Sequence, residues 1–205
     1  MRRAASRELR CLLFVYCFLS FDAPILFASQ VRPLNLEELT QRADRIFSGR
    51  CLDVQVGEDP ELHRVVTTVT MTVTRKVKGA VHGRVVFKML GSQDAEARSS
   101  ASLEGMPLFK RGEEAVLFLY GDSALGLTSP VGFGNGKFAV VADKQGRRHA
   151  VNGFGNEHLF SRLSPEAERK LEKGISSHRG RKAIPVDDVL DMVEKLGSPA
   201  GPHAP

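Results

Sequence analysis

The side chains that most often perform catalysis or hold metal ions are dispersed along this chain. Its six histidines form no His-x-His pair and no His-Glu-x-x-His element, so the spacing that places two imidazoles on one metal ion is missing. The serine motifs Gly-x-Ser-x-Gly and Ser-x-x-Lys are missing as well. The sequence therefore predicts no metal, no cofactor and no catalytic residue. Catalytic groups can also converge from distant positions, and an enzyme that uses His149 and Asp143 is the alternative hypothesis.

Cys51 is the one cysteine outside the first 28 residues, since Cys11 and Cys17 precede it. Without the first 28 residues the chain cannot form an internal disulfide. Cys51 lies within a strand pattern and has no histidine motif beside it, which predicts a small buried apolar residue rather than a nucleophile.

The tetrapeptide Gly-Phe-Gly-Asn occurs twice, at residues 132–135 and 153–156. The first copy superficially resembles a phosphate loop, but it precedes a strand pattern and lacks the Gly-Lys-Ser/Thr ending, which favours a turn with positive φ. The two copies have two open interpretations, a duplicated turn and a pair of loops that contact a partner. The candidate partner contacts are Phe133, Asn135, Phe154 and Asn156.

A cluster of basic residues surrounds the predicted hairpin at residues 75–88. On a barrel, this cluster suggests nucleic-acid binding, but single-strand binders interleave such charges with stacking aromatic residues, and here only Phe87 is near. A strand edge guarded by lysines is the favoured interpretation, so no nucleic-acid partner is predicted. The cluster consists of Arg75, Lys76, Lys78, His82, Arg84 and Lys88.

Most of the chain alternates apolar and polar residues with the period of β-strands. A bend or bulge is expected near Gly49, where the apolar face changes, and a long exposed loop is expected at 91–107. The stretch 115–120 is apolar at every position, which indicates a central strand. Five or six antiparallel strands without βαβ alternation predict a small OB-like barrel. The predicted strands are 46–56, 68–77, 84–90, 115–120, 137–141 and, as a sixth, 148–151.

Helices are predicted at both ends of this β region. Asn35 and Glu38 form a capping box at the start of a short helix over 35–43. Ser164-Pro165 begins a second helix that is expected to end at Gly174, and a third, over 186–196, has one apolar stripe. These features divide the chain into an OB-like barrel domain at 29–160, a helical C-terminal appendage at 161–197 and a disordered tail at 198–205.

The first residues have the order of a secretory signal. Arginines precede the apolar stretch 11–19, and Asp22 and Pro24 interrupt the apolar region before it reaches the length of a membrane span. Cleavage after Ala28 is expected, and an uncleaved anchor is the alternative and the only predicted membrane contact. The first 28 residues hold four arginines and two acidic residues, so their removal lowers the formal net charge from +5 to +3. That charge is too small to indicate a polyanionic partner.

Several short motifs occur in an order that resembles a known group of proteins. They are 43–50 (Ala-Asp-Arg-Ile-Phe-Ser-Gly-Arg), 76–79 (Lys-Val-Lys-Gly), 109–119 (Phe-Lys-Arg-Gly-Glu-Glu-Ala-Val-Leu-Phe-Leu) and 134–138 (Gly-Asn-Gly-Lys-Phe). Over roughly residues 35–155 the chain resembles a widespread group of uncharacterised secreted bacterial proteins with an OB-like barrel, distantly similar to the inhibitory domain of tissue inhibitors of metalloproteinases. The resemblance implies the barrel and export. It implies no functional residue, and the N-terminal cysteine and disulfides that the inhibitors use are missing here.

The leading functional hypothesis is an exported, non-catalytic binding or inhibitory module. It is expected to be secreted or periplasmic, and to present the 91–107 loop and the two Gly-Phe-Gly-Asn turns to an extracytoplasmic protein. An extracytoplasmic hydrolase and a structural envelope component held by the last helix are the alternatives. The sequence leaves the oligomeric state open.

Overall fold

The computed structural model describes residues 32–93 and 105–198. The predicted signal peptide, the middle of the predicted long loop and all but the first residue of the predicted tail lie outside the described residues. Within those two ranges, no helix combines the length and the apolar composition that crossing a bilayer requires.

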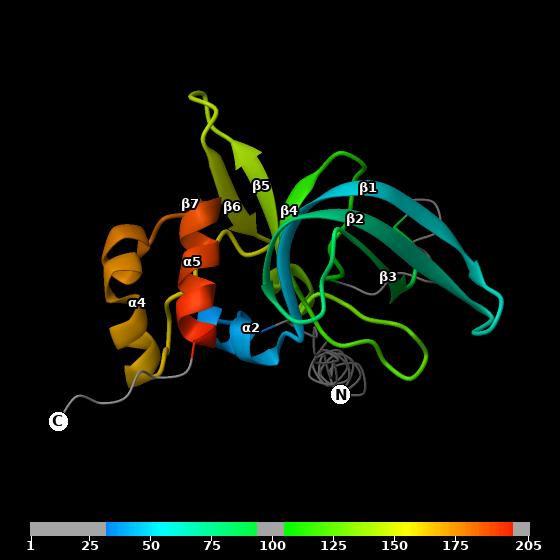
Figure 1. Ribbon diagram of the computed structural model, residues 1–205, viewed down its shortest axis with the longest axis horizontal. Coiled ribbons are helices and arrows are strands. Elements are labelled where there is room, and N and C mark those ends of the chain that lie inside the picture. The colour runs from blue at the N-terminus through cyan, green and yellow to red at the C-terminus, as the bar shows by residue number, and fades with distance from the viewer. Residues whose placement is uncertain (1–31, 94–104, 199–205) are drawn as a thin grey trace, which may run out of the picture. The chain divides into compact units, whose positions relative to one another are not determined.

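The fold contains one antiparallel sheet of seven strands in the order β3-β2-β1-β4-β5-β6-β7 (Figure 1). The mainly β, antiparallel prediction is confirmed, and all six expected strands are present. The seventh was not predicted, because two residues, one of them a proline, leave no periodicity in the sequence. The strands are β1 Arg45–Asp59, β2 Arg64–Lys78, β3 Arg84–Leu90, β4 Glu114–Leu119, β5 Lys137–Ala142, β6 Arg148–Asn152 and β7 Ile184–Pro185.

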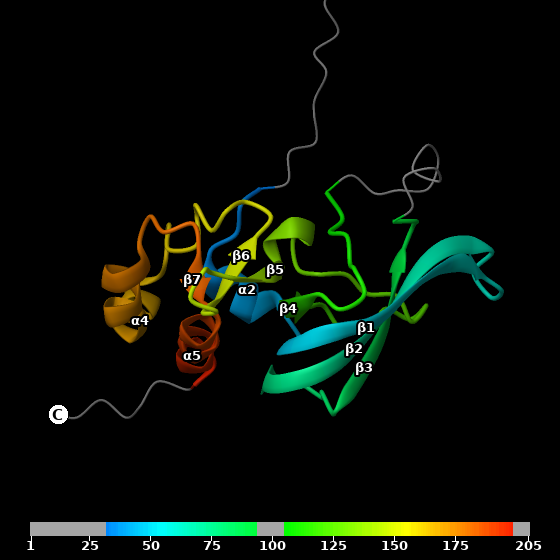
Figure 2. The ribbon, with the colours of Figure 1, turned by 90° about the horizontal axis from the view of Figure 1, so that it is seen from above.

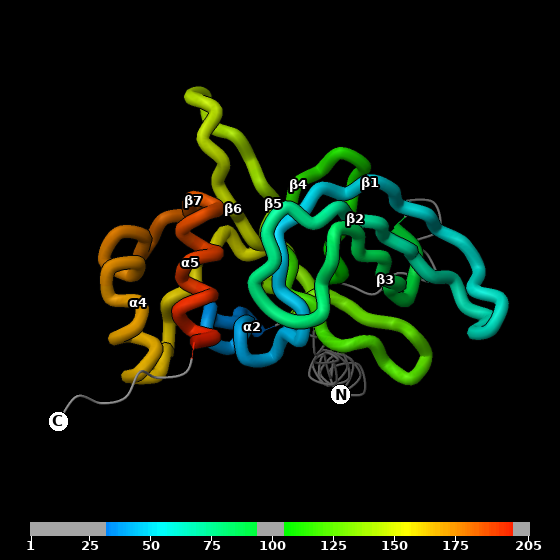
Figure 3. The backbone as a smooth tube through the Cα atoms, in the orientation of Figure 1, coloured from blue at the N-terminus to red at the C-terminus, as the bar shows by residue number. Residues whose placement is uncertain are grey.

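The sheet is not closed into a barrel, so that part of the prediction is wrong. β3 and β7 form its two edges. The 121–130 segment joins the region of β3 to that of β4 through two isolated bridges, Lys88 with Leu127 and Leu119 with Pro130, rather than through a continuous ladder. Beyond β4, the β5–β6 hairpin extends away from β1–β3 instead of curving back to them, as Figures 2 and 3 show. Apolar periodicity identifies the buried face of a strand, but it does not show whether the edges of a sheet meet.

The predicted irregularity in the first strand is confirmed. The pairing of β1 with β2 shifts register between Ser48 and Gly49, and again between Cys51 and Asp53. A Cβ atom on Gly49 would overlap the carbonyl oxygen of Thr72. Glycine at this position therefore allows the two strands of the long hairpin to approach each other closely.

Both faces of the central strand β4 are buried, which explains its uninterrupted apolar sequence. Val116 and Phe118 belong to a core that also includes the helices, whereas Ala115, Leu117 and Leu119 belong to a second core formed with β1–β3. This arrangement confirms the prediction that the strand is central.

The structure has three α-helices: α5 packs on one face of the sheet and contacts α2, and α4 packs beside α5 (Figure 2). Asn35 Oδ1 accepts a hydrogen bond from Glu38 N–H, and Glu38 Oε2 accepts one from Asn35 N–H, so the predicted capping box is confirmed. Ser164 caps the next helix, which continues through Gly174 instead of ending there. Gly174 lies inside the helix, where a Cβ atom would lie 2.5 Å from Met192 Sδ of the last helix, so glycine allows the two helices to approach closely. The helices are α2 Leu36–Arg42, α4 Pro165–His178 and α5 Val186–Gly197.

The apolar stripe of α5 packs against the sheet and α2. Val189, Leu190 and Val193 are buried in the same core as Phe118. Outside the core, Arg75 of β2 binds the carboxylates of Asp191 (2.7 Å) and Glu194 (2.9 Å). An apolar stripe with an ion-pair cluster beside it holds α5 in one orientation on the sheet.

Candidate binding surface

The two Gly-Phe-Gly-Asn turns lie side by side. Gly153 N–H donates a hydrogen bond to Gly134 O at 2.8 Å. A Cβ atom on Gly153 would lie 3.0 Å from that oxygen and 3.1 Å from Gly134 Cα, so the close approach depends on glycine. The structure therefore brings together the two turns that the sequence analysis singled out.

Asn135 links the first turn to the chain before α2. The turn forms a short 3-10 helix, Phe133–Asn135, and Asn135 is only 1% exposed. Its Oδ1 accepts from Leu34 N–H (2.9 Å), while its Nδ2 donates to Gly132 O (2.8 Å) and Arg32 O (3.3 Å). The amide is fully used inside the molecule.

Asn156 has the corresponding role in the second turn. It is 5% exposed, its Oδ1 accepts from Asn152 N–H (3.0 Å), and its Nδ2 donates to Ala150 O (2.9 Å) and Lys182 O (3.1 Å). Asn135 and Asn156 were predicted as partner contacts, and in this structure both amides are buried and bonded to the backbone, so neither is presented at the surface. Short polar side chains stabilise turns in this way, and the sequence does not show from which direction their partners come.

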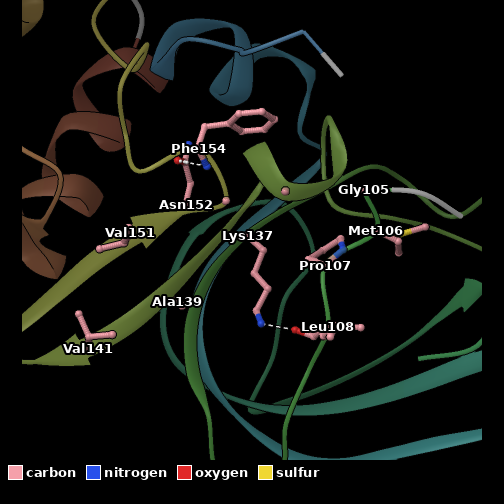
Figure 4. A pocket seen from close by; sticks show the side chains of 12 residues that line it. Gly105, Met106, Pro107, Leu108, Lys137, Ala139, Val141, Val151, Asn152 and Phe154 are labelled. Atoms are coloured by element: carbon pink, nitrogen blue, oxygen red, sulfur yellow. Dashed lines mark hydrogen bonds between the residues drawn. The ribbon is translucent and has the colours of Figure 1, made fainter. Parts of the chain in front are cut away.

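The two phenylalanines line neighbouring hollows. Phe154 lines a cavity of about 610 Å³ (Figure 4), and Phe133 lines a second one of about 330 Å³. Met106 lines both cavities, so the hollows meet beside it. Phe133 and Phe154 therefore remain candidate contacts, in contrast to the two asparagines.

One wall of the larger cavity is the face of the β5–β6 hairpin that no helix of the described chain covers. Ala139, Val141 and Val151 line it, whereas the alternate residues Phe138 and Ala150 point into the helix-covered core. Side chains of a strand alternate between its faces, so the helices cover only one side of this hairpin. The opposite wall is the segment 105–108 (Figure 4).

Lys137 connects the two walls at the base of the cavity. It is 9% exposed, and its Nζ donates to Leu108 O and to Glu113 Oε1, the latter at 2.6 Å. The same ammonium lies 4.6 Å from the centroid of the Phe109 ring. A buried ammonium needs such partners, and here they hold the segment 105–113 against β5. Sequence reasoning missed this residue, because no local motif links Lys137 to Glu113.

His149 and Asp143 lie close together but away from the cavity. Their Nδ1 and Oδ2 atoms are 4.0 Å apart. The Asp143 carboxylate accepts from Gln145 N–H, Arg147 N–H and Arg147 Nε–H. Partial burial acts to raise the pKa of Asp143, but the hydrogen bonds from Arg147 and Gln145 outweigh it and lower that pKa. The pair stabilises the hairpin turn, and neither residue lines the larger cavity.

Cys51 is 1% exposed, which confirms the prediction of a buried apolar residue. Burial raises the pKa of its thiol, and the nearby Glu113 carboxylate adds to the increase. A thiol in this position stays protonated and inaccessible at neutral pH. Across residues 32–93 and 105–198, no three histidine, cysteine, aspartate or glutamate side chains converge in a way that could hold a metal ion.

Half of the basic cluster is used inside the molecule. Arg75 binds the carboxylates of α5, Lys78 Nζ donates to Thr40 O at the end of α2 (2.9 Å), and Lys88 binds Asp59 (2.7 Å). The hydrogen bond from Lys88 is the main reason that the pKa of Asp59 is lowered. These three charges position structural elements.

No family model matches the chain, and no curated protein or solved structure is significantly similar to it. The proposal below therefore rests on the export signal that the sequence predicts and on the geometry of the cavity.

Proposed function

We propose that this protein is an exported, non-catalytic binding module, and that its partner is an extracytoplasmic protein bound in the larger cavity. The observation that supports this proposal best is the apolar face of β5–β6 that no helix of the described chain covers, which forms one wall of a hollow of about 610 Å³. The opposite face of the same hairpin is covered by helices. Exposure of an apolar sheet face to water is unfavourable in free energy, and binding of a partner removes that penalty.

Exposed apolar side chains gather at the two hollows. Five large hydrophobic residues of the described chain are exposed, and three of them line these hollows: Leu90 (40%), Leu108 (42%) and Val141 (49%). Single exposed hydrophobic residues are common on protein surfaces, whereas a group beside a cavity is typical of a contact surface.

Hydrogen bonds connect the walls of the cavity to their neighbours. Lys137 fixes the 105–108 wall, and the hydrogen bond between Gly153 and Gly134 joins the two turns at its end. A preformed surface loses little conformational entropy when it binds.

The experiment is a pull-down from envelope and culture-supernatant fractions, with the chain from Ser29 as bait. Val141→Glu places a charge on this apolar face of β5–β6. Val86→Glu is the matched control, because Val86 is an equally exposed strand valine (55%, against 49% for Val141) on the edge strand β3. We expect a specific partner that is lost with Val141→Glu and retained with Val86→Glu. A partner retained by both variants, or no partner for the unmodified chain, would contradict the proposal.

A further inference from the structure

We propose that the partner is bound as an extended peptide segment of alternating apolar and acidic residues, which pairs with the free edge of β5. This inference rests on the proposed function and names the chemistry of the partner. Three features support it: an unpaired strand edge, an apolar wall beside that edge, and unpaired positive charges in the segments that continue from the two walls of the cavity.

The free edge arises because β5 is longer than its ladder with β4. That ladder ends at the pair Ala115 and Ala139, whereas β5 continues to Ala142. Asp143 N–H donates to Arg147 O, so odd-numbered residues of this strand bond toward β6. Bonding direction alternates along a strand, and the N–H and C=O groups of Val140 and Ala142 therefore point toward the β4 side. In the described part of the chain no ladder partner occupies that position.

The apolar wall lies directly beside this edge. Val141, between the two outward-bonding residues, lines the cavity together with Ala139 and Val151. A strand that pairs with β5 would direct alternate side chains to the same side as Val141, and so into the cavity. The occupant needs apolar residues at every second position.

The charges of the two walls indicate which residues the bound peptide has at its remaining positions, those that do not point into the cavity. Every acidic residue of 105–114 and 137–151 is paired: Glu113 with Lys137, Glu114 with Arg50 and Arg148, and Asp143 with Arg147. By contrast, Lys110, Arg111 and Lys144 are exposed, and none forms an ion pair with any described residue. Lys110 and Arg111 lie two and three residues after Leu108 in the chain, and Lys144 lies three residues after Val141, so each wall of the cavity continues into unpaired cations. An acidic occupant would complement them.

A peptide fits this combination better than a lipid does. A fatty chain would fill the apolar cavity, but it would leave the outward N–H and C=O groups of Val140 and Ala142 without partners in a desolvated site. A peptide backbone satisfies those groups while its side chains fill the cavity.

The first test is a selection of short random peptides displayed on phage against the chain from Ser29, with binders of the Val141→Glu variant removed by counter-selection. We expect enriched sequences that alternate apolar residues with aspartate or glutamate. Enrichment of sequences without acidic residues would overturn the proposal. So would failure to enrich any peptide while decanoate shifts the NMR signals of Val141 and Val151, because the cavity would then be a lipid site.

The second test examines how an enriched peptide binds. Hydrogen exchange at Val140 and Ala142 should slow on binding. Two versions of the peptide are N-methylated, one at its odd and one at its even positions. Binding should weaken at least about tenfold for only one of them, the version whose methylated N–H groups face β5. Lys144→Glu should weaken it by a similar factor, whereas Lys173→Glu, an exposed charge on α4, should not. Equal binding of both N-methylated peptides would overturn strand addition. If Val141→Glu still abolished partner capture in that case, the binding module would stand and only the strand-addition mode would fail.

Discussion

Two copies of one tetrapeptide adopt different backbone conformations in this protein. In the first Gly-Phe-Gly-Asn turn the first two residues have positive φ, 57° at Gly132 and 55° at Phe133. In the second turn the last two have positive φ, 63° at both Gly155 and Asn156. Since the four residue types are identical, local preference does not explain the difference.

The difference follows from what each asparagine binds. Asn135 binds the backbone before α2, at Leu34 and Arg32, whereas Asn156 binds Ala150 in β6 and Lys182 before β7. The tetrapeptide therefore supplies residues that form turns, and distant backbone groups select the conformation.

Asn135→Ala should have the largest effect on stability. It leaves Leu34 N–H and the Arg32 carbonyl without the side-chain partner, while Gly132 O keeps only the backbone N–H of residue 135, so the free energy of unfolding should fall by about 3 kcal/mol. Urea denaturation measures this loss, and faster hydrogen exchange at Leu34 should accompany it. A loss below about 1 kcal/mol would show that water replaces the amide.

Asn156→Ala should cost about 2 kcal/mol, and here the backbone conformation contributes as well. Asn156→Gly should recover about 1 kcal/mol of that loss, because Asn156 has positive φ, which glycine adopts without strain. Asn135 does not have positive φ, so Asn135→Gly should be no more stable than Asn135→Ala. Equal stability of the two glycine variants in urea denaturation would show that backbone conformation at Asn156 does not contribute to its effect.

Phe154→Ala should weaken partner binding more than Phe133→Ala does. Phe154 lines the larger cavity, whereas Phe133 lines the neighbouring one, so we expect a loss of about tenfold for the first and a smaller loss for the second. Quantitative pull-down or calorimetry with the captured partner measures both. The reverse order would place the contact surface at the smaller hollow.

Gly153→Ala should destabilise the protein by about 1 kcal/mol, because the new Cβ would press on Gly134. Gly134→Ala is the matched control: its Cβ would meet nothing closer than 3.7 Å, and the change in unfolding free energy should stay within about 0.5 kcal/mol. Thermal denaturation of both variants tests whether the turns are coupled through this contact. Equal stability of the two variants would show that they are not.

Acid should loosen the tip of the β5–β6 hairpin that joins the two turns. The folded-state pKa of Asp143 is lowered, so its hydrogen bonds contribute stability above the ordinary aspartate value of about 4, and that contribution is lost as the pH falls through the folded-state pKa. Hydrogen exchange at Arg147 should accelerate over this range. Asp143→Asn should remove the pH dependence; an unchanged pH profile in this variant would contradict the assignment.

Several elements could be predicted from local pattern because their determinants are neighbours in the chain. The capping box of Asn35 and Glu38, the irregularity at Gly49 and the six longer strands are of this kind. The burial of Cys51 was also predicted, since it lies in a strand without a partner motif. Of the four predicted contact residues, Phe133 and Phe154 line cavities in the structure, whereas Asn135 and Asn156 are buried in the turns.

What the sequence determined by itself is which segments form strands and helices, since those depend on periodicity and caps within a few residues. The tertiary structure alone decided that the sheet stays open, that β7 joins its edge, and that Gly174 lies inside α4. It also decided that Lys137 binds Glu113 and that each asparagine binds a distant backbone group. These features depend on contacts between residues far apart in sequence, and a periodic pattern contains no information about which of its faces or edges will meet.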